Sequence, residues 1–213
     1  DTSRPASADP ERLLRAFRDF SCTNLFASPA LIDKLGRHGS RDGVRLDGLR
    51  RAISAGAPMA IPILERFVEL LEPGAQLFTP YGATEGLPLA SIGSDEILQE
   101  TRARTDSGEG VCVGRPVGDV AVEIIEISDE PIEEWRQAKR LLPGEIGEIV
   151  VRGSVVSRGY AHRPEADALA KIREGGAIWH RTGDVGYLDV KGRLWMCGRK
   201  AHRVEAETGT LFS

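Results

Sequence analysis

Residues 51–79 read RAISAGAPMAIPILERFVELLEPGAQLFT. The short apolar run at 51–55 predicts a buried strand, and the Gly-Ala-Pro turn at 56–58 ends it. Apolar residues then recur at the spacing of an amphipathic helix as far as Pro73-Gly74, and residues 75–79 predict the next strand. A strand, a helix and a strand in this order predict a parallel α/β sheet, in which ligands bind beyond the carboxyl ends of the strands.

The preceding residues extend this pattern toward the N-terminus. Asp9-Pro10-Glu11 opens a helix with an N-cap, a first-turn proline and a first-turn acid. An apolar run at 24–27 predicts a strand, and Ser28-Pro29 opens a second helix for which Gly36 is the expected stop. We therefore expect an α/β subdomain, a parallel sheet with flanking helices, over residues 1–104.

From about residue 105 the sequence becomes rich in predicted strands. They fall at residues 120–127, 145–152 and 185–196, and Lys191-Gly192 is a hairpin turn signal within the last of them. We expect a second, β-rich subdomain over 105–198, either barrel-like or a distorted sheet. Two helices are expected to interrupt it, at residues 132–140 and 164–172.

Composition excludes several classes of protein. Among 213 residues, 41% are hydrophobic and 28% are charged, which is typical of a globular fold and excludes disorder as the whole answer. The formal net charge of −4 argues against a nucleic-acid partner. No apolar run is long enough to span a membrane, and the first residues lack the apolar core of a signal peptide, so we expect a cytoplasmic protein. The three cysteines are scattered, and we expect them to be buried thiols.

Residues 79–86, TPYGATEG, place an aromatic ring, a hydroxyl and a carboxylate on one glycine-flanked loop. An aromatic ring can stack on a base, a threonine hydroxyl can bond a phosphate oxygen, and a carboxylate is a ligand that Mg²⁺ prefers beside phosphates. The set is suited to a metal-bound nucleotide. Two other interpretations stay open, namely that Tyr81 is a half-buried packing residue and that Glu85 is a solvated loop acid.

A second polar group follows at residues 179–184, WHRTGD, and at Gly198-Arg199-Lys200. Two antiparallel strands separate Asp184 from Arg199 and should bring their ends together. A carboxylate can bond both hydroxyls of a ribose, and an arginine beside it can serve ribose or phosphate. Alternatively, Asp184 is a simple turn residue and Arg199 is a surface partner for Glu205.

With SAGAP at 54–58, GEIGE at 144–148 and RGY at 158–160, these two groups resemble the motifs of the adenylate-forming enzymes, which include acyl-CoA synthetases, luciferases and peptide-synthetase adenylation domains. The order and spacing match over nearly the whole chain. The last residues, 198–213, are most similar to those of the olefin-pathway β-lactone synthetases. The resemblance implies part of the large N-terminal domain of such an enzyme, with residues 199–213 starting the hinge to a C-terminal lid.

The resemblance also implies roles for individual residues. Tyr81 would stack on adenine, Thr84 would contact the α-phosphate, and Glu85 would hold Mg²⁺, so that Thr84 and Glu85 are the catalytic candidates. Asp184 would bind the ribose hydroxyls with Arg199 beside it. The complete nucleotide-binding set that it implies is Gly56, Ala57, Pro58, Tyr81, Gly82, Ala83, Thr84, Asp184 and Arg199.

The implied activity is ATP- and Mg²⁺-dependent adenylation of a long-chain 2-alkyl-3-hydroxy acid, followed by intramolecular β-lactone formation with release of AMP. Two alternatives stay open: a fatty acyl-CoA synthetase or acyl-AMP ligase, and a non-catalytic nucleotide-binding module. Other olefin-pathway enzymes are the implied protein partners. Four apolar residues are candidates for the acyl pocket: Phe26, Leu87, Pro88 and Leu89.

The chain departs from the family pattern in three respects. The phosphate-gripping loop with its lysine is missing, since TDSGEG at 105–110 has no lysine and is predicted to be a surface turn. Ala201 stands where the family usually has an Asp or a Lys at the hinge. Because the lid is also missing, we expect the chain alone to be catalytically weak or inactive. His180 and His202 are expected to be structural, and Trp179 and Trp195 to fill the core.

Overall fold

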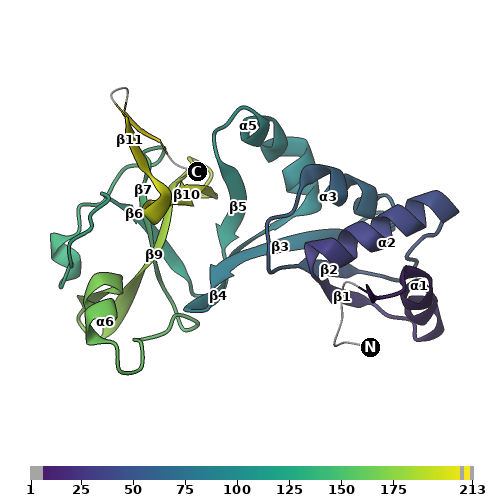
Figure 1. The fold of residues 1–213 in the computed structure, drawn as a ribbon, viewed down its shortest axis with the longest axis horizontal. Coiled ribbons are helices and arrows are strands. Elements are labelled where there is room, and N and C mark those ends of the chain that lie inside the picture. The colour runs from purple at the N-terminus through teal and green to yellow at the C-terminus, as the bar shows by residue number, and fades with distance from the viewer. Residues whose placement is uncertain (1–6, 207–208, 212–213) are drawn as a thin grey trace. The chain divides into compact units, whose positions relative to one another are not determined.

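The computed structural model of the chain describes residues 7–206 and 209–211. It divides into two compact units (Figure 1). Unit 1 comprises residues 1–80 and 92–102, and unit 2 comprises residues 81–91 and 103–213.

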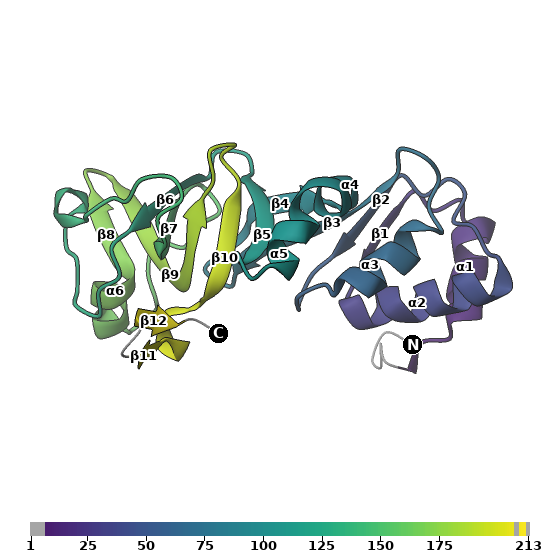
Figure 2. The ribbon, with the colours of Figure 1, turned by 90° about the horizontal axis from the view of Figure 1, so that it is seen from above.

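Unit 1 is built on parallel strands. Strand β2 (Arg51–Ser54) pairs in parallel with β1 (Asn24–Ala27) and with the first half of β3 (Gln76–Ala83). Helices α2 (Pro29–Asp42) and α3 (Ile61–Val68) make the crossovers and lie side by side on one face of these strands (Figure 2). This is the arrangement that right-handed crossovers impose, and it confirms the predicted parallel sheet with flanking helices.

Local sequence signals open both N-terminal helices as expected. Asp9 caps α1 (Pro10–Asp19), where its Oδ1 accepts hydrogen bonds from the backbone N–H groups of Glu11 and Arg12. Ser28 caps α2 in the same way by accepting a bond from the backbone N–H of Leu31.

The predicted end of the second helix was wrong. Gly36 lies inside α2, which continues to Asp42 and ends at Gly43 in the left-handed conformation, with φ of 63°. Gly36 and Gly39 are packing positions rather than stops. A Cβ on Gly39 would lie 2.3 Å from Cδ2 of Leu70. These glycines therefore let the second half of α2 pack closely against α3 and the residues that follow it. Propensity alone does not reveal this.

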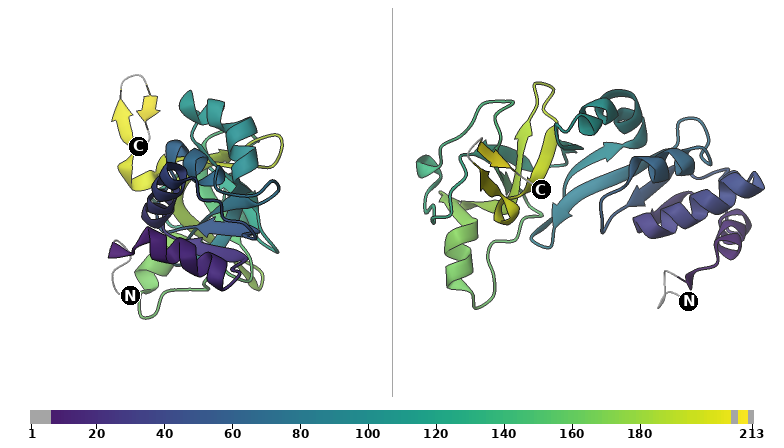
Figure 3. Two further views of the ribbon diagram at one scale, coloured as in Figure 1. Left: turned by 90° about the vertical axis from the view of Figure 1, so that its right-hand side faces the viewer. Right: turned by 45° about the horizontal axis from the view of Figure 1, so that its top comes forward.

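Unit 2 is an open antiparallel sheet with the strand order β4-β5-β10-β9-β7-β6, and β8 pairs with the N-terminal part of β9. Its first and last strands are not paired with each other in the described part of the chain, so the expected barrel-like shape is corrected to an open sheet. The long β9–β10 hairpin, yellow-green in Figure 3, turns at the predicted Lys191-Gly192. The strands are β4 (Gly86–Gly93), β5 (Val111–Pro116), β6 (Ala121–Ile125), β7 (Gly147–Arg152), β8 (Lys171–Glu174), β9 (Ala177–Leu188) and β10 (Leu194–Arg199).

The helices of the second half agree only in part with expectation. Helix α6 (Pro164–Ala170) forms as predicted and lies against β8 and β9 (Figure 2). The helix expected at 132–140 is reduced to the 3₁₀ turn η3 (Trp135–Gln137), which packs Trp135 onto Trp179 with ring centroids 4.3 Å apart. The remaining elements are α4 (Ser94–Glu96), the π-helix η2 (Ile97–Thr101), α5 (Arg102–Asp106), the 3₁₀ turn η4 (Lys200–His202) and the pair β11 (Val204–Ala206) and β12 (Gly209–Leu211).

Apolar side chains of the unit 2 strands form its core. Trp195 is fully buried and Trp179 nearly so, which confirms both predictions. Cys112 is buried, whereas Cys22 and Cys197 are half-buried free thiols, so the cysteine prediction holds for one of three. Over the described ranges, none of the helices combines the length and the apolar character that crossing a membrane requires.

Candidate functional site

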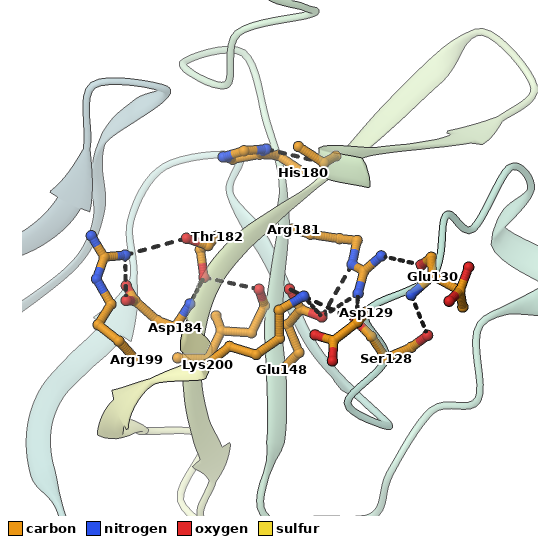
Figure 4. Close-up of polar contacts among 12 residues, drawn as sticks. Ser128, Asp129, Glu130, Glu148, His180, Arg181, Thr182, Asp184, Arg199 and Lys200 are labelled. Carbon is orange, nitrogen blue, oxygen red and sulfur yellow. Dashed lines mark hydrogen bonds and ion pairs between the residues drawn. The ribbon is translucent and has the colours of Figure 1, made fainter. Parts of the chain in front are cut away.

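Tyr81, Asp184 and Arg199 meet in unit 2. The Tyr81 hydroxyl donates a 2.5 Å hydrogen bond to Oδ2 of Asp184, and Arg199 Nη1 donates a 2.7 Å bond to Oδ1. Asp184 and Arg199 are direct register partners across β9 and β10, as the hairpin spacing predicts (Figure 4). The two sequence motifs therefore share one carboxylate.

Strand β9 holds Asp184 in place through its neighbours. The backbone N–H of Asp184 donates to Thr182 Oγ1 at 3.1 Å, and that hydroxyl donates to the backbone oxygen of Ile149 on β7 at 3.0 Å. Gly183 between them has φ of 72°, a conformation that a side chain would disfavour. The Thr-Gly-Asp sequence therefore fixes the direction of the carboxylate.

Tyr81 has both a packing and a polar role. It is half-buried and packs against the unit 2 core, as the packing interpretation requires. Burial and the adjacent Asp184 carboxylate raise the pKa of the Tyr81 phenol above its ordinary value, so the hydroxyl remains a donor. Asp184 lies within β9 and not in a turn. The alternative that Arg199 pairs with Glu205 concerns a side chain outside the described residues.

Thr84 and Glu85 form the two-residue turn between β3 and β4, so the loop expected within 79–86 is a tight hairpin turn. Thr84 is exposed and Glu85 is half-buried. Gly82 is required by packing, because a Cβ there would lie 2.5 Å from the backbone oxygen of Gly86. Ala83 ends β3 immediately before the turn.

The Glu85 carboxylate is contacted from the segment at 153–161. The Tyr160 hydroxyl donates a 2.8 Å bond to Glu85 Oε1, and the backbone N–H of Ser157 donates a 2.6 Å bond to the Glu85 carbonyl oxygen. The bond from Tyr160 lowers the pKa of Glu85, and the positive charge of Lys171 acts in the same direction. Glu85 is therefore a held, ionised carboxylate and not a freely solvated one.

Lys171 is a site residue that the sequence did not reveal. Its Nζ donates to the backbone oxygen and to Oγ of Ser157, at 2.6 and 3.0 Å, and lies 5.3 Å from the centroid of the Tyr160 ring. Burial lowers the pKa of Lys171, while Asp167 and Glu85 oppose that shift. No sequence signal pointed to this role, because Lys171 lies within the helix predicted at 164–172, whereas in the structure it begins β8.

His180 is buried and structural, as expected. Its Nδ1 lies 3.2 Å from the backbone oxygen of Ala170, and because a carbonyl can only accept, Nδ1 carries the proton. Burial and the positive charge of Lys171 lower the pKa of His180 to about 4. The ring is therefore neutral at pH 7.

A buried ion-pair network lies on the other side of β9 from Asp184 (Figure 4). Arg181 donates two bonds to Glu148 Oε2, at 2.6 and 3.1 Å, and both side chains are at most 2% exposed. Lys200 Nζ donates a 3.3 Å bond to Glu148 Oε2 and lies 3.2 Å from Oε1, and it donates a 3.0 Å bond to the backbone oxygen of Ser128. Sequence reasoning missed this network, which fixes the residue directly after Arg199.

The expected second wall of the nucleotide site, Gly56, Ala57 and Pro58, lies in unit 1. These residues follow β2 in an exposed turn, with Gly56 at φ of 97°. Ser54 just before them is 2% exposed, and its hydroxyl has no hydrogen-bond partner among the described residues. Since Tyr81 and Asp184 belong to unit 2, the shared adenine pocket stays a prediction.

The residues around Glu85 fit a magnesium ion that is held mainly by a nucleotide. In the described ranges, no three His, Cys, Asp or Glu side chains are grouped to share a metal. Tyr160 occupies only one oxygen of Glu85, and no described residue bonds the other. One free carboxylate oxygen beside phosphates and waters is the usual arrangement for Mg²⁺.

The candidate acyl-pocket residues differ in exposure. Leu89 is fully buried in the unit 2 core, whereas Leu87 is 54% exposed and Pro88 is also exposed. Phe26 is 71% exposed and lies in unit 1. Leu89 therefore serves the core, and Leu87 and Pro88 are the candidates beside Glu85 that a ligand can reach.

The family model described as AMP-binding enzyme matches residues 2–161 of this chain. Two relatives named olefin β-lactone synthetase align with the whole chain: the protein of Stenotrophomonas maltophilia strain K279a is 47% identical and that of Xanthomonas campestris pv. campestris is 45% identical. The chain covers only 39% and 38% of their lengths.

Solved structures agree with the fold. The amide bond synthetase McbA from Marinactinospora thermotolerans is 29% identical with a TM-score of 0.74, over 97% of this chain and 37% of that chain. The unliganded O-succinylbenzoate coenzyme A synthetase MenE from Bacillus subtilis also has a TM-score of 0.74, at 22% identity, over 96% of this chain and 39% of that chain. The expected fold, part of the large N-terminal domain of an adenylate-forming enzyme, is confirmed.

Proposed function

The chain belongs to the AMP-binding enzyme family, and from this premise we propose that it supplies the nucleotide site of an adenylate-forming β-lactone synthetase. The observation that carries the proposal is the Asp184 carboxylate, which receives Tyr81 and Arg199 from two distant motifs. The full-length relatives named olefin β-lactone synthetase support the choice within the family.

In this proposal, adenosine binds around Tyr81 and Asp184. The Tyr81 ring would stack on adenine, and the role that the resemblance implies for Gly56, Ala57 and Pro58, the opposite wall, stays a prediction. The ribose hydroxyls donate to Asp184, where they join or replace the bonds from the Tyr81 phenol and the 51%-exposed Arg199 guanidinium. An exposed arginine can move from ribose to phosphate at little cost because water solvates it.

The phosphates would lie over the hairpin turn. Gly82 and Ala83 bring the backbone close to them, the exposed Thr84 hydroxyl donates to the α-phosphate, and the free oxygen of Glu85 holds Mg²⁺. When bound, the metal offsets the charge that accumulates as two anions approach each other. Thr84 and Glu85 are therefore the groups of this chain placed at the reacting phosphorus.

The proposed reaction has two steps. A substrate carboxylate oxygen forms a bond to the α-phosphorus of ATP, and pyrophosphate leaves with the bridging oxygen. The β-hydroxyl oxygen of the same acid then bonds to the acyl carbon, its proton is lost, and AMP leaves as the four-membered lactone closes. Because nucleophile and carbonyl are in one molecule, the second step benefits from a high effective concentration.

Product identity tests this function. A polypeptide with the full length of the relatives, given ATP, Mg²⁺ and a long-chain 2-alkyl-3-hydroxy acid, should yield AMP, pyrophosphate and a product one water lighter than the acid, detected by mass spectrometry. Equal pyrophosphate release with a simple fatty acid plus CoA would favour the acyl-CoA synthetase instead. Nucleotide binding without pyrophosphate release would favour the non-catalytic module. Association with other olefin-pathway enzymes stays a prediction.

Glu85→Gln should separate metal-dependent adenylation from nucleotide binding. The amide keeps the shape and an acceptor oxygen but loses the charge that Mg²⁺ requires. We expect pyrophosphate release to fall by about 10- to 100-fold, while AMP affinity changes by less than about twofold. Glu126→Gln, at an exposed ion pair with Lys139, is the matched control. Normal adenylation by Glu85→Gln would remove Glu85 from the metal site.

A further inference from the structure

We propose that Tyr160 is a positioning residue for the Glu85 carboxylate and that Lys171 holds in place the segment carrying Tyr160. The inference rests on the proposed function, in which Glu85 holds Mg²⁺. It assigns roles to Lys171, which lies in none of the quoted motifs, and to Tyr160, which the Arg-Gly-Tyr motif at 158–160 contains without a role having been given to it.

Two bonds join the Tyr160 segment to the hairpin turn. The Tyr160 hydroxyl donates to Glu85 Oε1 at 2.8 Å, and Ser157 N–H donates to the Glu85 carbonyl oxygen at 2.6 Å. The first bond fixes one carboxylate oxygen, and the second fixes the backbone that carries it. The remaining oxygen, Oε2, is thereby held in one direction without a protein partner among the described residues.

Helix α6 and strand β8 hold that segment from behind. The backbone N–H of Tyr160 donates to Asp167 Oδ1 at 2.8 Å, and a Cβ on Gly159 would lie 2.9 Å from Asp167 Oδ2. Lys171 donates twice to Ser157 and lies 5.3 Å from the Tyr160 ring centroid. A cation near an aromatic ring is attracted to its face, so Lys171 holds both ends of the segment from 157 to 160.

This arrangement matters because a metal site depends on the groups that orient its ligands. Partners that bond a metal ligand from behind typically contribute about 10- to 100-fold to metal affinity. A tyrosine hydroxyl fits this role, because it donates to an ionised carboxylate without neutralising it. Burial and the bond to Glu85 also raise the pKa of Tyr160 to about 12, which keeps the hydroxyl protonated.

The test is a metal titration of the protein with ATP bound, in which Mn²⁺ replaces Mg²⁺ and free Mn²⁺ is measured by electron paramagnetic resonance. Tyr160→Phe removes the hydroxyl and keeps the ring over Lys171. We expect Mn²⁺ affinity to fall about 10-fold, while AMP affinity measured in EDTA changes by less than about twofold. Tyr187→Phe is the matched control, because its hydroxyl bonds the backbone oxygen of Glu109 instead. It should change neither affinity.

The outcomes distinguish this inference from the proposed function. If Glu85→Gln weakens Mn²⁺ binding and Tyr160→Phe does not, the positioning role is wrong and the metal site stands. If Glu85→Gln leaves Mn²⁺ binding unchanged, the metal assignment falls and the positioning role falls with it. Equal losses of Mn²⁺ and AMP affinity in Tyr160→Phe would show a general disturbance and also overturn the inference.

Lys171→Met provides a second variant that keeps the Tyr160 hydroxyl and most of the side-chain volume. We expect a loss of Mn²⁺ affinity of about threefold, smaller than in Tyr160→Phe because the bond to Glu85 survives. Wild-type Mn²⁺ affinity in Lys171→Met would remove Lys171 from the proposal. If Tyr160→Phe folds poorly, Lys171→Met still tests whether the Tyr160 segment positions Glu85, because it disturbs that segment and keeps the Tyr160 hydroxyl.

Discussion

Asp184→Ala is expected to weaken ATP binding by about 10- to 100-fold. A hydrogen bond to a charged group contributes about 1.5–3 kcal/mol, and each 1.4 kcal/mol corresponds to a factor of ten in affinity. The variant removes the acceptor proposed for the ribose hydroxyls and also releases Arg199, which bonds the same carboxylate. Isothermal titration calorimetry with ATP and with AMP measures the change, and both nucleotides should be affected because both contain ribose.

Two further variants test whether the loss of ATP affinity comes from the Asp184 carboxylate itself. Tyr81→Phe keeps the ring and removes only the 2.5 Å bond to Asp184, so it should lose less affinity than Asp184→Ala. Glu126→Gln, which removes an exposed negative charge in the same unit, should leave ATP affinity unchanged. ATP affinity that is normal in Asp184→Ala would refute the ribose assignment, whatever the other two variants show.

The two carboxylates of the site differ in how the protein uses them. Both oxygens of Asp184 accept bonds from protein side chains, whereas Glu85 has one oxygen bonded and one open among the described residues. A carboxylate that is already surrounded by donors suits hydroxyl groups that join or exchange with those donors. One with an open oxygen suits a hard cation. These surroundings support the proposed roles of the two acids, Asp184 as the acceptor for ribose and Glu85 as the magnesium ligand.

Local pattern predicted those features that depend on neighbours in the sequence. The strand–helix alternation predicted β1 to β3, and the hairpin at Lys191-Gly192 predicted that Asp184 and Arg199 meet. Gly36 was misinterpreted because a helix C-cap glycine and a packing glycine are identical in sequence, and only the contact with the α3 segment separates them.

Contacts between segments that are distant in the chain could not be predicted from the sequence. Lys171 reaches Ser157 only because α6 returns the chain to β9, and no spacing rule joins the two residues. The helix expected at 132–140 is only a 3₁₀ turn in the structure, where Trp135 packs on Trp179. In each case tertiary contacts override the local signal.

Glu148→Gln is expected to lower the free energy of unfolding by about 3–5 kcal/mol, because it leaves the buried Arg181 guanidinium without its counter-ion. Glutamine has nearly the same shape, so the loss is one of charge and not of volume. Bonds to the backbone oxygens of Ser128 and Glu130 remain for Arg181, but these are dipoles and cannot neutralise it. Since native domains are stable by only about 5–15 kcal/mol, such a loss is large.

Urea denaturation followed by tryptophan fluorescence measures this loss in the relevant unit, because Trp135, Trp179 and Trp195 all lie in unit 2. Glu126→Gln removes the same group from an exposed pair and should cost less than about 1 kcal/mol. Replacing both buried partners, as Glu148→Leu with Arg181→Met, should cost less than Glu148→Gln alone, since no buried charge is left unpaired and Lys200 can reach water. If Glu148→Gln were as mild as the exposed control, the ion-pair network would contribute little to the stability of unit 2, and the pairing of β9 with β7, β8 and β10 would hold the strand without it.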